Sequence, residues 1–92
     1  MATANAQSAA APAPRPDRNR ARNAYQSGRR AEQSSDWKTA YASYVEATTY
    51  DPANKEYSLL KEHARFQVIQ ELIDNAERQA LAGEIANARA LL

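Results

Sequence analysis

Residues 34–54 read SSDWKTAYASYVEATTYDPAN, and this stretch decides how the chain folds. The polar residues 34–36 interrupt a helical pattern, because Ser and Asp side chains compete for backbone hydrogen bonds and favour caps and turns. After this break, apolar side chains recur at steps that place them on one face of a helix over residues 36–50. They are Trp37, Ala40, Tyr41, Tyr44, Val45, Ala47 and Thr48.

The helix over 36–50 ends at Asp51-Pro52, since the residue before a proline is driven out of the helical conformation. We expect Asp51 to cap the following helix and Pro52 to lie in its first turn. Upstream, Asp17 follows Pro16 and predicts the N-cap of a helix over 17–33. The apolar positions of that helix are small, which implies close approach of another helix: Ala21, Ala24, Tyr25, Gly28 and Ala31.

A long third helix is predicted over residues 53–81, with one broad apolar stripe. The stripe comprises Leu59, Leu60, His63, Ala64, Phe66, Ile69, Leu72, Ile73, Ala76 and Ala80. Gly83 predicts a break, since glycine suits the left-handed position after a helix end. A fourth helix is expected from about Glu84, with Ile85, Ala88, Leu91 and Leu92 on one face. The fold class predicted is therefore all-α, with antiparallel hairpins.

The first sixteen residues hold seven alanines and three prolines, and no large apolar side chain after Met1. This composition predicts a disordered tail over 1–16, which leaves one helical domain over 17–92. There is no cysteine, and no apolar run approaches the length of a membrane span or of a signal peptide's core. The location expected is cytoplasmic as the chain stands. It becomes periplasmic or outer-membrane-associated if a signal peptide precedes Met1, because ATANAQ is typical of the region after a cleaved signal.

Charge is unevenly distributed along the chain. Residues 1–30 carry six arginines and a single acid, Asp17, whereas residues 31–92 carry six basic and ten acidic side chains. A basic arm therefore precedes an acidic body.

Residues 21–54 resemble a tetratricopeptide repeat, a helical hairpin of about 34 residues. The matching positions are the small Gly28, Ala40 and Ala47, the aromatic Trp37 and Tyr44, and the closing segment Asp51-Pro52-Ala53-Asn54. Ala24 and Ser27 depart from the pattern, which usually has larger side chains at both positions. The weakly packed first helix fits a terminal repeat.

A partial second copy is expected over 69–92, with Leu72, Ala76, Gly83, Ala88 and Leu92 at the matching positions. The fourteen residues 55–68 between the copies lengthen the third helix. The combination of Tyr57 with Glu62-His63-Ala64-Arg65-Phe66 resembles the region that precedes bacterial secretins of secretion and pilus systems.

The resemblance to tetratricopeptide repeats implies a protein-interaction scaffold, in which stacked hairpins line a groove for partner segments. Its groove positions correspond to Arg22, Tyr25, Arg29 and Glu32 in the first copy, and to Gln70, Ile73, Glu77 and Ala80 in the second. The secretin resemblance implies a place in a bacterial secretion or pilus assembly.

Catalytic, metal and cofactor sites are not predicted. His63 is the single histidine and lies in a helical stripe, so a structural role is favoured. Glu71, Asp74 and Glu77 share one face, which is typical of a solvated surface. No glycine-rich phosphate loop or nucleophile with an adjacent base is present. Trp37 and the tyrosines of residues 41–50 are interpreted as hairpin core in preference to a ligand-stacking set. The chain is therefore not expected to be an enzyme.

Two other functions stay open. The arginines of residues 15–30 can attract RNA or an anionic membrane surface, although the acidic body and the scarcity of aromatic side chains make nucleic acid the weaker prediction. Alternatively, Ile85, Leu91 and Leu92 bury against another copy, and the C-terminal helix is a structural oligomerisation segment.

Overall fold

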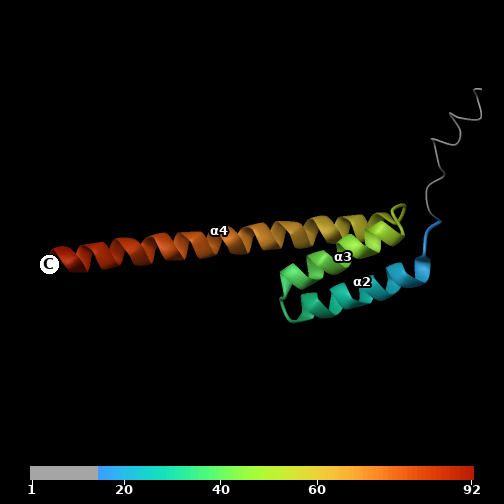
Figure 1. Ribbon diagram of the computed structural model, residues 1–92, viewed down its shortest axis with the longest axis horizontal. Helices are drawn as coiled ribbons and strands as arrows, with labels where there is room; N and C mark the ends of the chain where they lie inside the picture. Colours follow the sequence, from blue (N-terminus) through green and yellow to red (C-terminus); the bar gives the residue numbers. More distant parts are fainter. Residues whose placement is uncertain (1–14) are drawn as a thin grey trace, which may run out of the picture.

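The computed structural model describes residues 15–92, which form three helices: α2 (Arg18–Gln33), α3 (Trp37–Tyr50) and α4 (Lys55–Leu91). No strand occurs in this part of the chain, so the all-α prediction is confirmed. The predicted disordered tail over 1–16 falls outside the described residues, apart from its last two positions. Figure 1 shows α2 and α3 as a hairpin lying against the first part of α4, which continues far beyond it. The principal extents of the molecule are 81 × 35 × 15 Å.

Both helices of the hairpin, α2 and α3, begin at an aspartate N-cap. The side chain of Asp17 accepts a hydrogen bond from the backbone amide of Arg20 at 3.0 Å, and Asp36 accepts one from that of Thr39 at 3.2 Å. These bonds satisfy amides at each helix start that have no partner inside the helix. At the open end of the hairpin, the Asp17 amide donates to the Tyr50 carbonyl at 2.9 Å. The predicted N-cap at Asp17 is thus confirmed, and α3 begins at a cap within the polar break predicted at residues 34–36.

The turn between α2 and α3 is a Schellman motif. The amide of Asp36 donates to the carbonyl of Ala31, and the amide of Ser35 donates to that of Glu32, both at 2.9 Å. This geometry places Ser35 in the left-handed region, with φ of 58°. Asp36 therefore ends one helix through its backbone and begins the next through its side chain, which makes the connection short.

The core of the hairpin is built from alanines and one buried tyrosine. Ala40 and Tyr44 of α3 are fully buried, in a cluster that also contains Ala31 of α2 and Ala64 of α4. A Cβ atom added to Gly28 would lie 2.8 Å from both Cδ1 and Cζ of Tyr44, and closer still to Cε1. Gly28 and Ala40 therefore face inward, as the small-residue pattern predicts.

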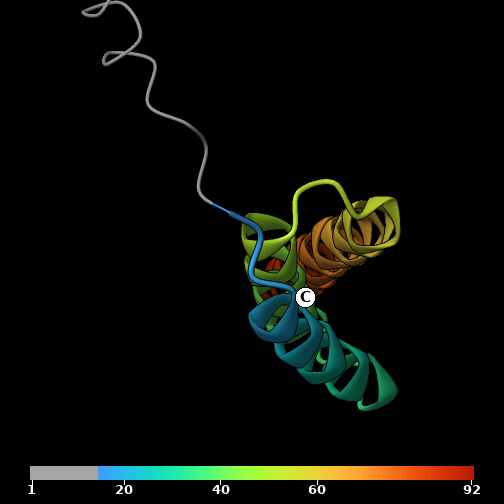
Figure 2. The ribbon, with the colours of Figure 1, turned by 90° about the vertical axis from the view of Figure 1, so that its right-hand side faces the viewer.

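α3 packs against both α2 and α4. Figure 2, turned by 90°, shows that the three helices do not lie in one plane. A second buried cluster lies near the open end of the hairpin and comprises Ala21, Ala24, Ala47 and Tyr57. Across it the rings of Tyr25 in α2 and Tyr57 in α4 are 5.2 Å apart. Trp37 is partly buried, and its ring meets that of exposed His63 edge-on at 5.3 Å.

The junction between α3 and α4 differs from the prediction. α4 begins at Lys55 and its N-cap is Asn54, whose side chain accepts from the Tyr57 amide at 3.2 Å. Asp51 is the C-cap of α3, and Pro52 and Ala53 lie in the turn. The prediction that Asp51 caps a helix starting near Ala53 was wrong by one short turn, because Asn54 supplies a competing cap three residues later.

The predicted break at Gly83 was also wrong. α4 runs without interruption from Lys55 to Leu91, and Gly83 has no positive φ. Gly83 and Ala88 are exposed on a continuous helix, so the hairpin predicted for the second copy over 69–92 is not formed. A single glycine costs a helix only about 1 kcal/mol relative to alanine. The surrounding alanines, leucines and glutamates favour the helix enough to carry it through that position.

Candidate functional site

The most prominent surface feature is an exposed apolar face on α4. Its large members are Leu59, Phe66, Ile69 and Ile73, which are 72%, 59%, 41% and 45% exposed. Ala76 and Ala80 continue the same face at steps of three and four residues, and both are exposed. We call these six residues the outer face of α4. Large exposed apolar patches mark interaction surfaces in soluble proteins.

The outer face is opposite the side of α4 that the hairpin covers. Tyr57 and Ala64 are buried against the hairpin, and Leu60 is packed against the same core. At 3.6 residues per turn, Ala64 and Phe66 lie about 160° apart around the helix axis. The single broad stripe expected from the sequence is therefore two faces, of which one is packed and the other is free.

Beyond residue 68, every residue of α4 is exposed. Figure 1 shows this part of the helix projecting past the turn between α2 and α3 with no other element beside it. The hairpin thus holds the base of α4, and the remainder of the helix has no partner within the described part of the chain. An isolated helix of this kind gains little from propensity alone, so packing against something else would stabilise it.

The groove residues predicted on α2 have several different environments. Oε1 of Glu32 accepts a hydrogen bond from the Tyr44 hydroxyl at 2.7 Å. Oε2 of Glu32 forms an ion pair with Arg29 at 3.0 Å. The charge of Glu32 raises the pKa of Arg29 above its ordinary value. Tyr25 packs on Tyr57, and Arg22 is exposed. Arg29 and Glu32 are therefore held by contacts within the hairpin.

The groove residues predicted on α4 lie elsewhere. Gln70, Ile73 and Glu77 are all exposed on the projecting part of α4. The structure does not bring them into one groove with Arg22, Tyr25, Arg29 and Glu32, because α2 and α4 meet chiefly near their N-terminal ends through Tyr25 and Tyr57. The two sets form separate surfaces.

A shallow hollow lies where α2 and α4 approach each other. It is lined by Arg18, Arg22, Asp51, Ala53, Asn54 and Tyr57, and we call it the α2–α4 hollow. Neither arginine makes an ion pair within residues 15–92. Two free guanidinium groups beside a tyrosine ring suit a carboxylate, since guanidinium recognises carboxylates with paired hydrogen bonds.

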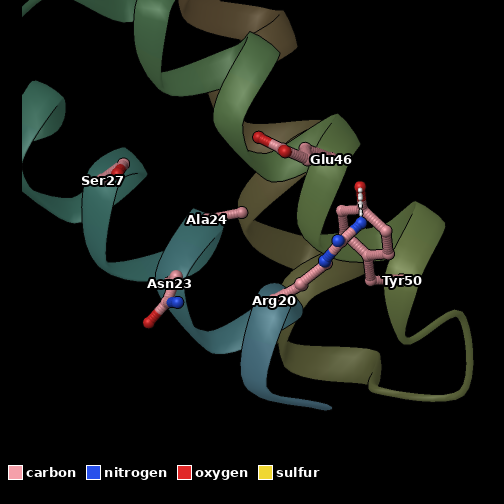
Figure 3. A pocket seen from close by; sticks show the side chains of 6 residues that line it. All are labelled: Arg20, Asn23, Ala24, Ser27, Glu46 and Tyr50. Atoms are coloured by element: carbon pink, nitrogen blue, oxygen red, sulfur yellow. Dashed lines mark hydrogen bonds between the residues drawn. The ribbon is translucent and has the colours of Figure 1, made fainter. Parts of the chain in front are cut away.

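A second hollow lies between α2 and α3 and is lined by Arg20, Asn23, Ala24, Ser27, Glu46 and Tyr50 (Figure 3). Arg20 lies 5.5 Å from the centre of the Tyr50 ring, and its Nη1 donates to the Tyr50 hydroxyl at 3.3 Å. This hydrogen bond raises the pKa of Arg20. Arg20 also forms an ion pair with Asp17 at 3.5 Å, so its charge already has a partner within the chain.

Among residues 15–92, no group of three or more histidine or acidic side chains is placed to bind a metal ion. The helices described here also lack any stretch long and apolar enough to cross a membrane. The absence of enzyme activity stays a prediction from the sequence.

Comparison with protein-family models, with curated proteins and with solved structures finds no match to this chain. The class of protein is therefore defined by its geometry: an all-helical chain in which a short hairpin supports one long, projecting helix.

The free outer face of α4 was not predicted as one surface, although two of its residues, Ile73 and Ala80, were predicted as groove positions. The signal for it was present, because Phe66, Ile69 and Ile73 lie three and four residues apart and away from Ala64. Periodicity shows which residues share a helix face, but it does not show which face another element will cover.

Proposed function

We propose that this protein is an interaction module in which the hairpin of α2 and α3 holds the base of α4, and the outer face of α4 binds a helix of another protein chain. The observation that carries this proposal is the exposure of Leu59, Phe66, Ile69 and Ile73 on one side of a helix. Side chains of this size are usually buried, and each contributes about 1.5–3 kcal/mol when it leaves water. A partner helix with its own apolar stripe is the shape that fits such a face.

The tetratricopeptide interpretation agrees with this assignment. In such repeats, one hairpin leaves an apolar face that the next helix covers. Here the hairpin has the small residues that the resemblance requires at Gly28 and Ala40, and α4 then presents the uncovered face. Membership of a bacterial secretin or pilus assembly stays a prediction from the sequence resemblance alone.

The test is site-specific photocrosslinking in cells that produce the protein. Photoreactive benzoylphenylalanine is placed at Phe66 or Ile73 on the outer face. Ala82 is the matched control, since it is also exposed on α4 but lies on the other side of the helix. We expect light-dependent protein adducts at 66 and 73 and none at 82. A lack of adducts at both outer positions, or equal adducts at all three, would overturn the proposal.

The α2–α4 hollow supports a second candidate function, the binding of an acidic protein segment. Arg18 and Arg22 carry it, because both are exposed and neither is paired within the described residues. Fluorescence anisotropy with a labelled acidic peptide and with a single-stranded RNA separates this function from RNA binding. Peptide binding that is lost in Arg22→Gln supports it. Binding of the RNA alone, with steep salt dependence, supports the RNA-binding alternative in its place.

A further inference from the structure

The outer face belongs to a longer row of residues on α4, whose side chains change from large to small at its midpoint. Steps of alternately three and four residues from position 59 define the row, and all ten of its members are exposed. In order they are Leu59, Glu62, Phe66, Ile69, Ile73, Ala76, Ala80, Gly83, Asn87 and Ala90. The first five side chains are large, whereas the last five are small. We call these ten residues the outer row.

We propose that a second copy of this chain is the partner of α4, packed antiparallel along the outer row with the two-fold axis between Asp74 and Asn75. This inference rests on the proposed function, because it names the protein that the outer face binds. In this register each large side chain of one copy faces a small one of the other. The facing pairs are Ile73 with Ala76, Ile69 with Ala80, Phe66 with Gly83, Glu62 with Asn87, and Leu59 with Ala90.

Size complementarity selects the antiparallel arrangement. Facing helices pack well when large and small residues alternate across the interface. A parallel pair in register would place Phe66 on Phe66 and Gly83 on Gly83, which crowds one half of the interface and leaves gaps in the other. The antiparallel pair fills every layer to a similar volume. The one polar layer joins Glu62 to Asn87, whose amide can donate to the carboxylate.

Gly83 provides an independent reason to place a neighbour here. A glycine inside an exposed helix is unfavourable relative to alanine. Within this chain a Cβ atom at Gly83 would meet nothing within 4 Å, so no contact of the single copy requires glycine. Facing Phe66 of a second copy, the missing side chain leaves room for an aromatic ring. The same residue thus has a packing role in the pair that it lacks in the single chain.

The surroundings of the outer row are compatible with this pairing. Along one edge, Gln70 faces Glu77 and His63 faces Glu84, so like charges do not meet. The hairpin packs on the opposite side of α4, through Tyr57 and Ala64, and leaves the row open. The overlap from Leu59 to Ala90 spans about 45 Å at 1.5 Å per residue. The two hairpins would then lie at opposite ends of the pair.

The first test is analytical ultracentrifugation of the full chain and of two variants. We expect a dimer for the unmodified chain. Gly83→Leu adds bulk where Phe66 of the other copy must fit, and we expect it to raise the dissociation constant by at least about tenfold. This variant should not damage the single chain, because the space at Gly83 is open and leucine favours a helix more than glycine does. Circular dichroism checks that its helix content is kept.

Ala82→Leu is the matched control, since it adds a similar bulk at the neighbouring exposed position on the other side of α4. It should leave the dissociation constant within about twofold of the unmodified value, as expected for a surface change. Dimerisation that is unaffected by Gly83→Leu, or lost equally in both variants, would overturn the inference.

The second test measures orientation. The chain has no cysteine, so Arg89→Cys provides a single attachment site for a spin label, on a side of α4 away from the outer row. In the antiparallel pair the two labelled positions are separated by roughly 45 Å along the axis. A parallel pair would place the two labels at the same level along the axis, separated only by the roughly 8–10 Å between the helix axes and the reach of two outward side chains, and therefore well short of that distance. The short distance would contradict the proposal.

The outcomes also separate this inference from the proposed function. A chain that stays monomeric at all concentrations, yet forms adducts with a different protein at Phe66 and Ile73, overturns the second copy as partner and keeps the interaction function. A monomer without adducts overturns both. Adducts of twice the mass of the chain support both.

Discussion

The hydroxyl of Tyr44 in α3 donates a 2.7 Å hydrogen bond to Oε1 of Glu32 in α2, at a point where the Tyr44 ring is fully buried. The other oxygen of the Glu32 carboxylate accepts from Arg29 at 3.0 Å. A buried aromatic side chain, a carboxylate and a guanidinium thus connect the two helices of the hairpin in one chain of contacts. Arg29 also acts on the Tyr44 hydroxyl, and its charge partly opposes the effect of Glu32 on the pKa of Tyr44.

We expect Tyr44→Phe to lower the free energy of unfolding by about 1–2 kcal/mol, because it removes a hydrogen bond to a charged group while keeping the ring in the core. Glu32 retains Arg29 as a partner, so the loss should not exceed this range. Urea unfolding followed by the fluorescence of Trp37, the single tryptophan, measures it. Tyr41→Phe is a matched control, since the Tyr41 hydroxyl makes no hydrogen bond within residues 15–92. An equal loss in both variants would mean that the Glu32 contact contributes nothing.

Because Tyr44 is buried, we also expect the free energy of unfolding to depend on pH in the alkaline range. Burial, and then the hydrogen bond to Glu32, raise the pKa of Tyr44 well above its ordinary value. The folded chain therefore holds the phenolic proton more tightly than the unfolded chain, and unfolding releases it once the pH exceeds the unfolded pKa of about 10. The free energy of unfolding should fall above that pH by about 1.4 kcal/mol per unit from this group.

The difference in unfolding free energy between the unmodified chain and Tyr44→Phe isolates this contribution, since the remaining titrating groups are common to both. The difference should be constant at neutral pH and shrink above about pH 10. A difference that stays constant to the highest pH at which the chain folds would show that Tyr44 is not shielded as the structure indicates.

Gly28→Ala should destabilise the hairpin although alanine is the better helix former. The added Cβ would overlap the ring of Tyr44, which has no space to withdraw because it is fully buried. Overpacking of this kind costs about 1–3 kcal/mol, more than the roughly 1 kcal/mol gained in helix propensity. Thermal unfolding followed by circular dichroism measures the outcome. Gly83→Ala is the comparison, measured at concentrations where the chain is monomeric: nothing lies within 4 Å of the added Cβ in the single chain, so propensity acts alone and helix content should rise. A rise in stability for both variants would show that Gly28 does not lie in the contact between α2 and α3.

The hairpin could be predicted from sequence because its signals are local. Asp17 and Asp36 each precede a helical pattern, and Gly28 lies opposite large aromatic residues on the next helix. Each of these residues acts through its immediate neighbours, so no knowledge of distant packing was needed. The cap of α4 was misplaced because Asp51 and Asn54 both suit that role, and only the geometry of the turn decides between them.

The fate of α4 could not be predicted, because it depends on contacts that local sequence does not encode. Gly83 permits a left-handed turn but does not require one, and a turn forms only when the following segment can pack back on the helix. Val68 and the residues before it have the hairpin to pack against, whereas every residue after Gly83 is exposed along the continuing helix. The break was expected from the preference of glycine for the position after a helix end, and the continuous helix shows that this preference alone does not end a helix.

Ser35→Gly should raise the free energy of unfolding by about 1 kcal/mol. Ser35 adopts φ of 58°, a conformation that costs residues other than glycine roughly 1–2 kcal/mol. The Schellman motif normally has glycine at this position. Part of the gain is offset, since glycine also adds entropy to the unfolded chain. Ser34→Gly is the matched control: Ser34 has φ of −99°, and its hydroxyl donates to the Ala31 carbonyl at 3.1 Å, so this change should destabilise the hairpin. Urea unfolding measures both variants side by side. A loss of stability in both variants would contradict the assignment of Ser35 to the left-handed position.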